Sequence, residues 1–96
     1  MPTPLDDAWE AVKKALAAIK AAKKEKKDQK DNIDIISIAL GKDGLTPEQA
    51  TELNQKKNAA QDAWKAAKQA EEDAKMQLAI ASGQLAQQLV LDALKK

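Results

Sequence analysis

Apolar residues near the start of the chain recur at the spacing of an amphipathic helix. The large ones step by four and three positions, and alanines fill the positions beside them. The stripe consists of Leu5, Trp9, Val12, Leu16 and Ile19, flanked by Ala8, Ala11, Ala15, Ala18 and Ala22. This pattern predicts a helix whose apolar face packs against a second element, with Trp9 as an anchor of that core.

Two segments of different character follow this stripe. Residues 23–32 carry no apolar side chain on any face, whereas residues 33–40 are rich in isoleucine. β-branched residues favour strands, but the sequence offers no second strand with which residues 33–40 would pair. We therefore expect one helix over about residues 4–40, with a kink or break near residues 28–32 as the alternative.

Residues 40–49 have the composition of one helix ending and another beginning. Gly41 is suited to the left-handed conformation that closes a helix, and Gly44 loosens the connection. Threonine, proline and an acid or amide then occupy the N-cap, first and third positions of a capping box. At the second helix these are Thr46, Pro47 and Gln49, and at the first they are Thr3, Pro4 and Asp6. The sequence thus predicts a turn at residues 41–45.

The second half of the chain predicts a longer helix, over about residues 46–95. Its apolar stripe consists of Ala50, Leu53, Ala60, Trp64, Ala67, Ala74, Leu78 and Ala81. Small residues let two helices approach closely but bury little area each, so we expect a thin and weakly stabilising seam. Beyond Met76 the apolar surface widens, and Ser82 with Gly83 inside it suggests a bend.

These elements predict an all-α fold. We expect a single helical domain over residues 1–96, built as a long antiparallel helical hairpin of the coiled-coil kind. If the chain folds back near residue 43, residue n lies beside roughly residue 86 minus n. The polar segment 23–32 then faces residues 54–63, which are also polar, and this agreement supports the hairpin.

The same register leaves apolar residues without partners at both ends of the hairpin. Residues 33–40 face few apolar side chains, and residues 84–96 face none in the first helix. We expect these surfaces to drive formation of a homo-oligomer. The candidate self-association residues are Ile33, Ile36, Leu40, Leu85, Leu89 and Leu94.

Three arrangements cover such surfaces. A short third helix after Gly83 folds back over the Trp9 end, or two hairpins pair as an antiparallel dimer that forms a four-helix bundle. A head-to-tail contact instead gives a ring or a filament. The antiparallel dimer is favoured, because one closed interface covers both surfaces.

Composition narrows the chemistry that the chain can perform. It has no Cys and no His, which removes nucleophilic triads, thiolate sites and the commonest metal ligand. Asp28, Asp31 and Asp34 lie at neighbouring helical positions but lack the glycine turn and terminal glutamate of a calcium loop. We therefore expect no catalytic, cofactor or metal site. The chain is interpreted as a non-catalytic structural or self-assembling module.

Lysines are concentrated in residues 13–30, where eight of them stand against Glu25 and Asp28. This segment favours a second interpretation, electrostatic binding to an anionic membrane surface or to nucleic acid. It contains no arginine and no aromatic residue, so contact with nucleic acid would be nonspecific. The whole chain has a formal net charge of only +1, which makes a solvated lysine face the simpler interpretation.

All sixteen basic residues are lysine, and alanine is abundant. Such an alphabet of strong helix formers is typical of designed helical bundles, whereas the polar and isoleucine-rich segments are less regular than an idealised design. Natural and artificial origins both stay open. No signal peptide or membrane-spanning segment is expected, because the longest apolar runs fall short of the roughly 20 residues that a bilayer requires.

The layout resembles that of type III secretion needle subunits, as an alanine-rich hairpin with Thr-Pro near its start and a proline just after the turn. The resemblance is carried by Thr3-Pro4, Asp6-Asp7, and Pro47 with Ala50 and Leu53. The chain lacks the Pro-x-x-Pro turn and the tyrosine-rich second helix of that family. The resemblance implies a filament-forming helical hairpin.

Overall fold

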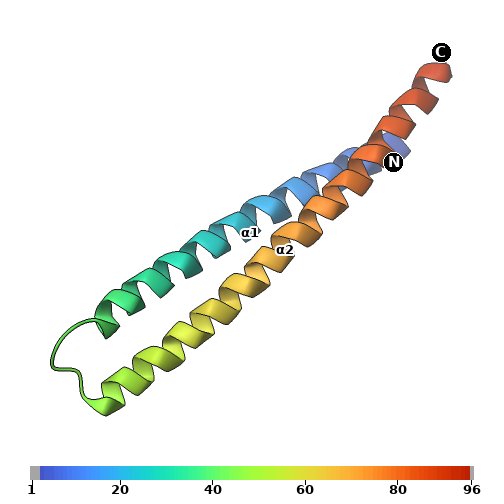
Figure 1. Ribbon diagram of the computed structural model, residues 1–96. Helices are drawn as coiled ribbons and strands as arrows, with labels where there is room; N and C mark the ends of the chain where they lie inside the picture. The colour runs from blue at the N-terminus through green and yellow to red at the C-terminus, as the bar shows by residue number, and fades with distance from the viewer. Residues whose placement is uncertain (1–2, 96) are drawn as a thin grey trace. The chain divides into compact units, whose positions relative to one another are not determined.

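The computed structural model describes residues 3–95, which form two long helices joined by a turn (Figure 1). Helix α1 spans Pro4–Leu40 and helix α2 spans Pro47–Leu94. No strand occurs among the described residues. The predicted all-α helical hairpin is therefore confirmed, and the isoleucine-rich segment 33–40 belongs to α1.

Both helices begin with the predicted capping boxes. The backbone N–H of Asp6 donates to Thr3 Oγ1 at 3.1 Å, and the N–H of Thr3 donates to Asp6 Oδ2 at 3.1 Å. At the second helix, the N–H of Gln49 donates to Thr46 Oγ1 at 3.1 Å, and the N–H of Thr46 donates to Gln49 Oε1 at 3.0 Å. Each box satisfies N–H groups that have no partner within the helix, which fixes where the helix begins.

The turn uses its glycines differently from the prediction. Gly44 adopts the left-handed conformation, with φ at 84°, and no other described glycine has a positive φ. Gly41 instead continues the helical bonding, since its N–H donates to Ile38 O at 3.1 Å and to Ser37 O at 3.2 Å. The prediction of a left-handed Gly41 is therefore wrong. Helix α1 closes with a tighter final turn, and the backbone reverses three residues later.

The chain divides into two compact units, and each contains one stretch of α1 packed against one stretch of α2. Unit 1 consists of Met1–Ala21 and Ala70–Lys96, and unit 2 consists of Ala22–Gln69, which includes the turn. Helix α2 continues through Ser82 and Gly83, so the residues after Gly83 extend α2 and do not form the separate third helix considered above.

Alanines dominate the buried face of both helices. The buried apolar residues are Ala8, Ala15 and Ala22 in α1, and Ala60, Ala67, Ala74, Ala81 and Leu85 in α2. The alanines of each helix are seven positions apart, the repeat of a coiled coil, and we call this face the alanine seam. No described side chain is less than 2% exposed. The seam is thin because each alanine buries only a methyl group.

The alanine seam displaces Trp9 from the core. Ala8 and Ala15 are buried, and the residue after each is rotated by about 100° around the helix. Trp9 is consequently 46% exposed and Leu16 is 52% exposed. The prediction of Trp9 as a core anchor is therefore wrong. Leu5, Val12 and Ile19, from the same predicted stripe, are half-buried at the edge of the seam.

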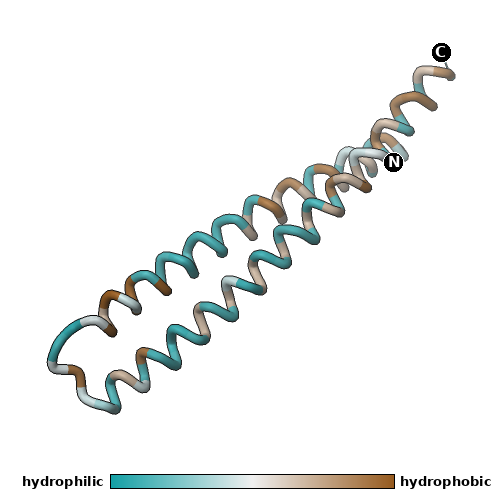
Figure 2. Tube along the Cα trace, viewed as in Figure 1, coloured by the Kyte–Doolittle hydropathy of each residue, from teal (hydrophilic) through white to brown (hydrophobic). Residues whose placement is uncertain are grey.

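The polar segment 23–32 remains helical inside unit 2, although it has no apolar side chain (Figure 2). Pairs one turn apart support it: Gln29 Nε2 donates to Glu25 Oε1 at 2.8 Å, and Lys27 Nζ lies 3.9 Å from Asp31 Oδ2. Such pairs each stabilise a helix by about 0.2–0.5 kcal/mol. No break occurs near residues 28–32.

The register in unit 1 differs from the predicted one. Pro4 and Ala8 share a groove with Gln84 and Gln88. Residue n of α1 therefore lies across from roughly residue 92 minus n, about six positions further along α2 than expected. As a result, α2 has partners in α1 as far as residue 88. The tail without partners is shorter than predicted.

Candidate association surface

Ten large apolar side chains are at least 46% exposed among the described residues. Ile35 and Ile38 lie in unit 2, and the other eight lie in unit 1. We call these eight the unit 1 apolar surface: Trp9, Leu16, Met76, Ile80, Leu89, Val90, Leu91 and Leu94. Soluble proteins rarely leave so many large apolar residues in water unless the surface binds something.

Most of the α2 residues of this surface share one side of the helix. At about 100° per residue, Met76, Ile80, Val90, Leu91 and Leu94 fall within about 100° of one another. The buried α2 residues of unit 1, Ala74, Ala81 and Leu85, fall on the opposite side. In unit 1, α2 therefore carries apolar residues both on the side that packs against α1 and on the other side.

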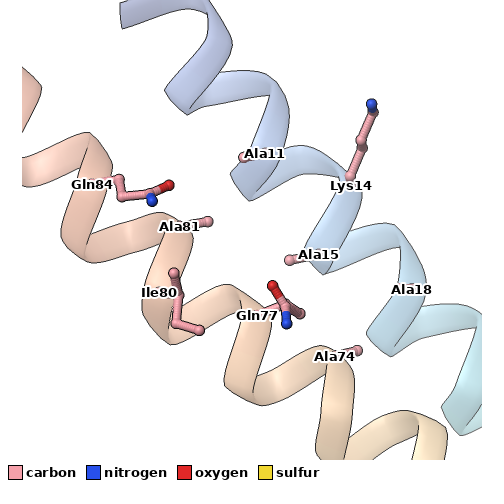
Figure 3. A pocket seen from close by; sticks show the side chains of 9 residues that line it. All are labelled: Ala11, Lys14, Ala15, Ala18, Ala74, Gln77, Ile80, Ala81 and Gln84. Carbon is pink, nitrogen blue, oxygen red and sulfur yellow. The ribbon is translucent and has the colours of Figure 1, made fainter. Parts of the chain in front are cut away.

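A groove runs along unit 1 between α1 and α2 (Figure 3). Its volume is about 340 Å³, at the small end of ligand-binding pockets. We call it the alanine groove, and it is lined by Ala11, Lys14, Ala15, Ala18, Ala74, Gln77, Ile80, Ala81 and Gln84. Five of these nine residues are alanine, so the groove presents mostly methyl groups, with polar side chains at its edges.

The predicted self-association residues are placed unevenly. Ile33, Ile36 and Leu40 are half-buried in unit 2. Leu85 is 8% exposed and belongs to the alanine seam, whereas Leu89 and Leu94 are exposed in unit 1. The association surface proposed below therefore includes Leu89 and Leu94 and leaves Leu85 out.

Sequence reasoning missed the exposure of Trp9 and Leu16, which it assigned to the apolar stripe of the first helix. It expected a wide apolar surface after Met76, but its list of self-association residues left out Met76, Ile80, Val90 and Leu91. The signal that identifies Trp9 and Leu16 is the alanine repeat itself. Alanines seven positions apart mark the closest approach of the two helices, so Trp9 and Leu16, one position after Ala8 and Ala15, fall beside the seam.

The two tryptophans differ in their electrostatic surroundings. Trp64, in unit 2, is half-buried, and Lys68 Nζ lies 5.5 Å from its ring centroid. Among the described residues Trp9 has no cation over its ring, and Lys14, at the edge of the alanine groove, makes no ion pair. The neighbouring Lys13 differs, because its Nζ lies 3.9 Å from Glu10 Oε1. Within the described residues of unit 1, the exposed ring of Trp9 therefore has no cation over it, and the ammonium group of Lys14 has no carboxylate partner.

One charged residue is buried among the described residues. Glu71, in unit 1, is 5% exposed, and Lys75 Nζ lies 3.5 Å from its Oε1. A buried carboxylate is tolerated when a cation is close. Glu71 therefore adds a charged residue to the buried face of α2.

Groups that hold metal ions are not brought together within residues 3–95, where no three acidic residues form a cluster suited to an ion. Neither α1 nor α2, within the described residues, contains a stretch long and apolar enough to cross a membrane. The chain matches no known protein family, no curated protein and no solved structure.

Proposed function

We propose that the chain is a non-catalytic helical module that associates with further copies of itself. One observation carries this proposal: the eight large side chains of the unit 1 apolar surface are each at least 46% exposed. Soluble proteins rarely leave such a surface in water, and association with another copy buries part of it.

The energetic gain comes from the unit 1 apolar surface. Fully burying a leucine, isoleucine, valine or methionine side chain stabilises by about 1.5–3 kcal/mol, so a half-exposed one still gains roughly 1 kcal/mol. A contact that covers four of them on each of two copies gains about 8 kcal/mol. Association costs about 4–15 kcal/mol in lost freedom of motion. Because the two quantities are of the same order, we expect association that strengthens with concentration.

Two of the three arrangements expected from the sequence remain. The compact monomer with a third helix is excluded, because the residues after Gly83 continue α2. The antiparallel dimer that forms a four-helix bundle and the head-to-tail assembly both bury the unit 1 apolar surface against another copy.

A test replaces exposed residues of the tail with glutamine, which keeps the net charge unchanged. In the triple variant Leu89→Gln, Leu91→Gln and Leu94→Gln, we expect association to weaken by at least about tenfold. The control carries Ile35→Gln and Ile38→Gln, which are also exposed, at 64% and 65%, but lie in unit 2. Light scattering measures the mass of each variant at matched concentrations. Equal association of both variants with the unchanged protein would argue against the proposal.

Binding to an anionic surface is the second candidate. Lys20, Lys23, Lys24, Lys27 and Lys30 are all exposed on α1, and they supply the positive charge that it requires. Glu25, Asp28 and Asp31 are exposed among them, which gives a surface of mixed sign. Binding to anionic vesicles or duplex DNA that falls with added salt would support this candidate, and no binding at low salt would remove it.

A further inference from the structure

The two edges of unit 1 differ in shape. On α1, Trp9 and Leu16 lie one position after seam alanines, whereas Ala11 and Ala18 lie three positions after the same alanines. At about 100° per residue, Trp9 and Ala11 are about 200° apart around α1. On α1, one edge therefore carries large exposed side chains and the opposite edge carries alanines of the groove, whereas the α2 side of the groove includes Ile80, which is 50% exposed.

The alanine groove suits a flat apolar side chain. Its alanines leave room between the helices, about 340 Å³ in all, and they offer methyl groups as walls (Figure 3). Lys14 stands at the edge of this groove without an ion pair among the described residues. Trp9 supplies the matching chemistry, because its ring is 46% exposed and has no cation over it. Lys68 and Trp64 already form such a contact within the chain.

We propose that Trp9 of one copy docks into the alanine groove of a second copy, where Lys14 lies over its ring. The charges agree with this contact, because Asp6, one helical turn before Trp9, brings a carboxylate toward the same lysine. Asp6 makes no ion pair among the described residues, although its carboxylate accepts the N–H of Thr3. Docking therefore gives both the ring and the lysine a partner.

The contact is heterologous, because each copy uses one edge to insert Trp9 and the other edge to receive it. This inference rests on the proposed self-association, and it gives an open-ended contact between opposite edges of unit 1 in place of the closed antiparallel dimer.

Two variants of the full chain remove the two sides of the contact separately. Trp9→Ala removes the inserted ring, and Ala18→Gln blocks the groove at a residue that is exposed and outside the seam. We expect each to weaken association by roughly thirtyfold or more, as for other buried tryptophan anchors. The matched controls are Ile38→Ala, an exposed large residue that lies in unit 2 and outside the unit 1 apolar surface, and Ala17→Gln, an exposed neighbour outside the groove. Circular dichroism confirms that every variant remains helical.

Mixing the two variants is the decisive step. Trp9→Ala keeps an intact groove and Ala18→Gln keeps an intact ring, so a mixture can form one contact but cannot extend it. At concentrations where each variant alone stays at 10.4 kDa, we expect the equimolar mixture to contain dimers of twice that mass by sedimentation velocity. Lys14→Gln in the chain that supplies the groove should weaken these dimers by about fivefold.

The outcomes separate the two proposals. If the unchanged protein stays monomeric at every concentration, both proposals fail. If it associates but Trp9→Ala and Ala18→Gln associate equally well, self-association stands and the docking of Trp9 is refuted. The docking is likewise refuted if both variants are monomeric and their mixture is monomeric too.

Discussion

The turn offers a sharp test, because its two glycines should respond to alanine in opposite ways. Gly44 has a φ of 84°, and a Cβ built on it meets no heavy atom within 4 Å. The Gly44→Ala change therefore creates no clash, and its main effect is the strain of a left-handed alanine, about 1–2 kcal/mol, which outweighs the gain from a narrower unfolded ensemble. At Gly41 the backbone φ is not positive, and the nearest atom to a new Cβ is Ile38 O at 3.5 Å, an ordinary contact.

We expect Gly41→Ala to be neutral or to stabilise the protein by up to about 1 kcal/mol, since alanine favours the helix end and narrows the unfolded ensemble. The free energies of unfolding of the two variants should differ by about 1–3 kcal/mol. For a chain of this size, each kcal/mol shifts Tm by about 4–8 °C.

Thermal and urea unfolding followed by circular dichroism measure this difference. All proteins must be compared at one low concentration, because self-association raises the apparent stability of any variant that retains it. The reasoning is refuted if Gly41→Ala is the more damaging of the two changes. That result would mean that the left-handed residue is Gly41, as the sequence alone suggested.

Three other substitutions test the helices and the seam. Gly83→Ala should stabilise the protein by about 1 kcal/mol, because Gly83 is inside α2 and no heavy atom lies within 4 Å of the new Cβ; a lower Tm would contradict a continuous α2. Thr46→Ala should lower the free energy of unfolding by about 1 kcal/mol, because the N-cap hydrogen bond is lost. Thr51→Ala, inside the helix, should not have this effect. A lower urea midpoint for Thr51→Ala than for Thr46→Ala would contradict the role of Thr46 as the cap. Ala67→Leu should lower the free energy of unfolding by about 1–3 kcal/mol, because the larger side chain overfills the alanine seam. Ala66→Leu, at an exposed position beside the seam, should lower it much less. Equal Tm values for the two variants would contradict the position of the seam at Ala67.

The fold was largely predictable because its signals are local. Thr3 and Thr46, each followed by proline, set the start of a helix within a few residues, and the two glycines between residues 40 and 45 mark the turn that separates the helices. The helical state of the polar segment 23–32 was harder to predict, since a helix without an apolar face shows no hydrophobic periodicity that would identify it. It is helical because its residues favour the helix and pair along it.

The candidate site was less predictable, because the rotation of each helix is decided by packing between helices. Ranking residues by size places Trp9 inside, since a tryptophan buries more apolar area than an alanine. In the structure the alanines are buried and Trp9 is exposed, because alanines repeated every seven residues let the two backbones approach over many turns. The same effect makes Ile36 half-buried and leaves Ile35 and Ile38 exposed.

The register was mispredicted for a related reason. The predicted register assumes that residues at equal distances along the chain from residue 43 lie beside each other in the two helices. The actual register is set by which layers of the seam fit together, and it brings Gln84 and Gln88 beside Pro4 and Ala8. A small displacement of this kind decides which residues of the tail remain exposed, so sequence reasoning assigned Leu85 to the surface although it is buried.

The most direct test of the account is the mass of the unchanged protein in solution, measured by sedimentation equilibrium over a wide range of concentration. A surface that the chain cannot cover by itself predicts a mass that rises above 10.4 kDa as the concentration increases. A mass that stays at 10.4 kDa at the highest concentration, with the helices intact by circular dichroism, would contradict it.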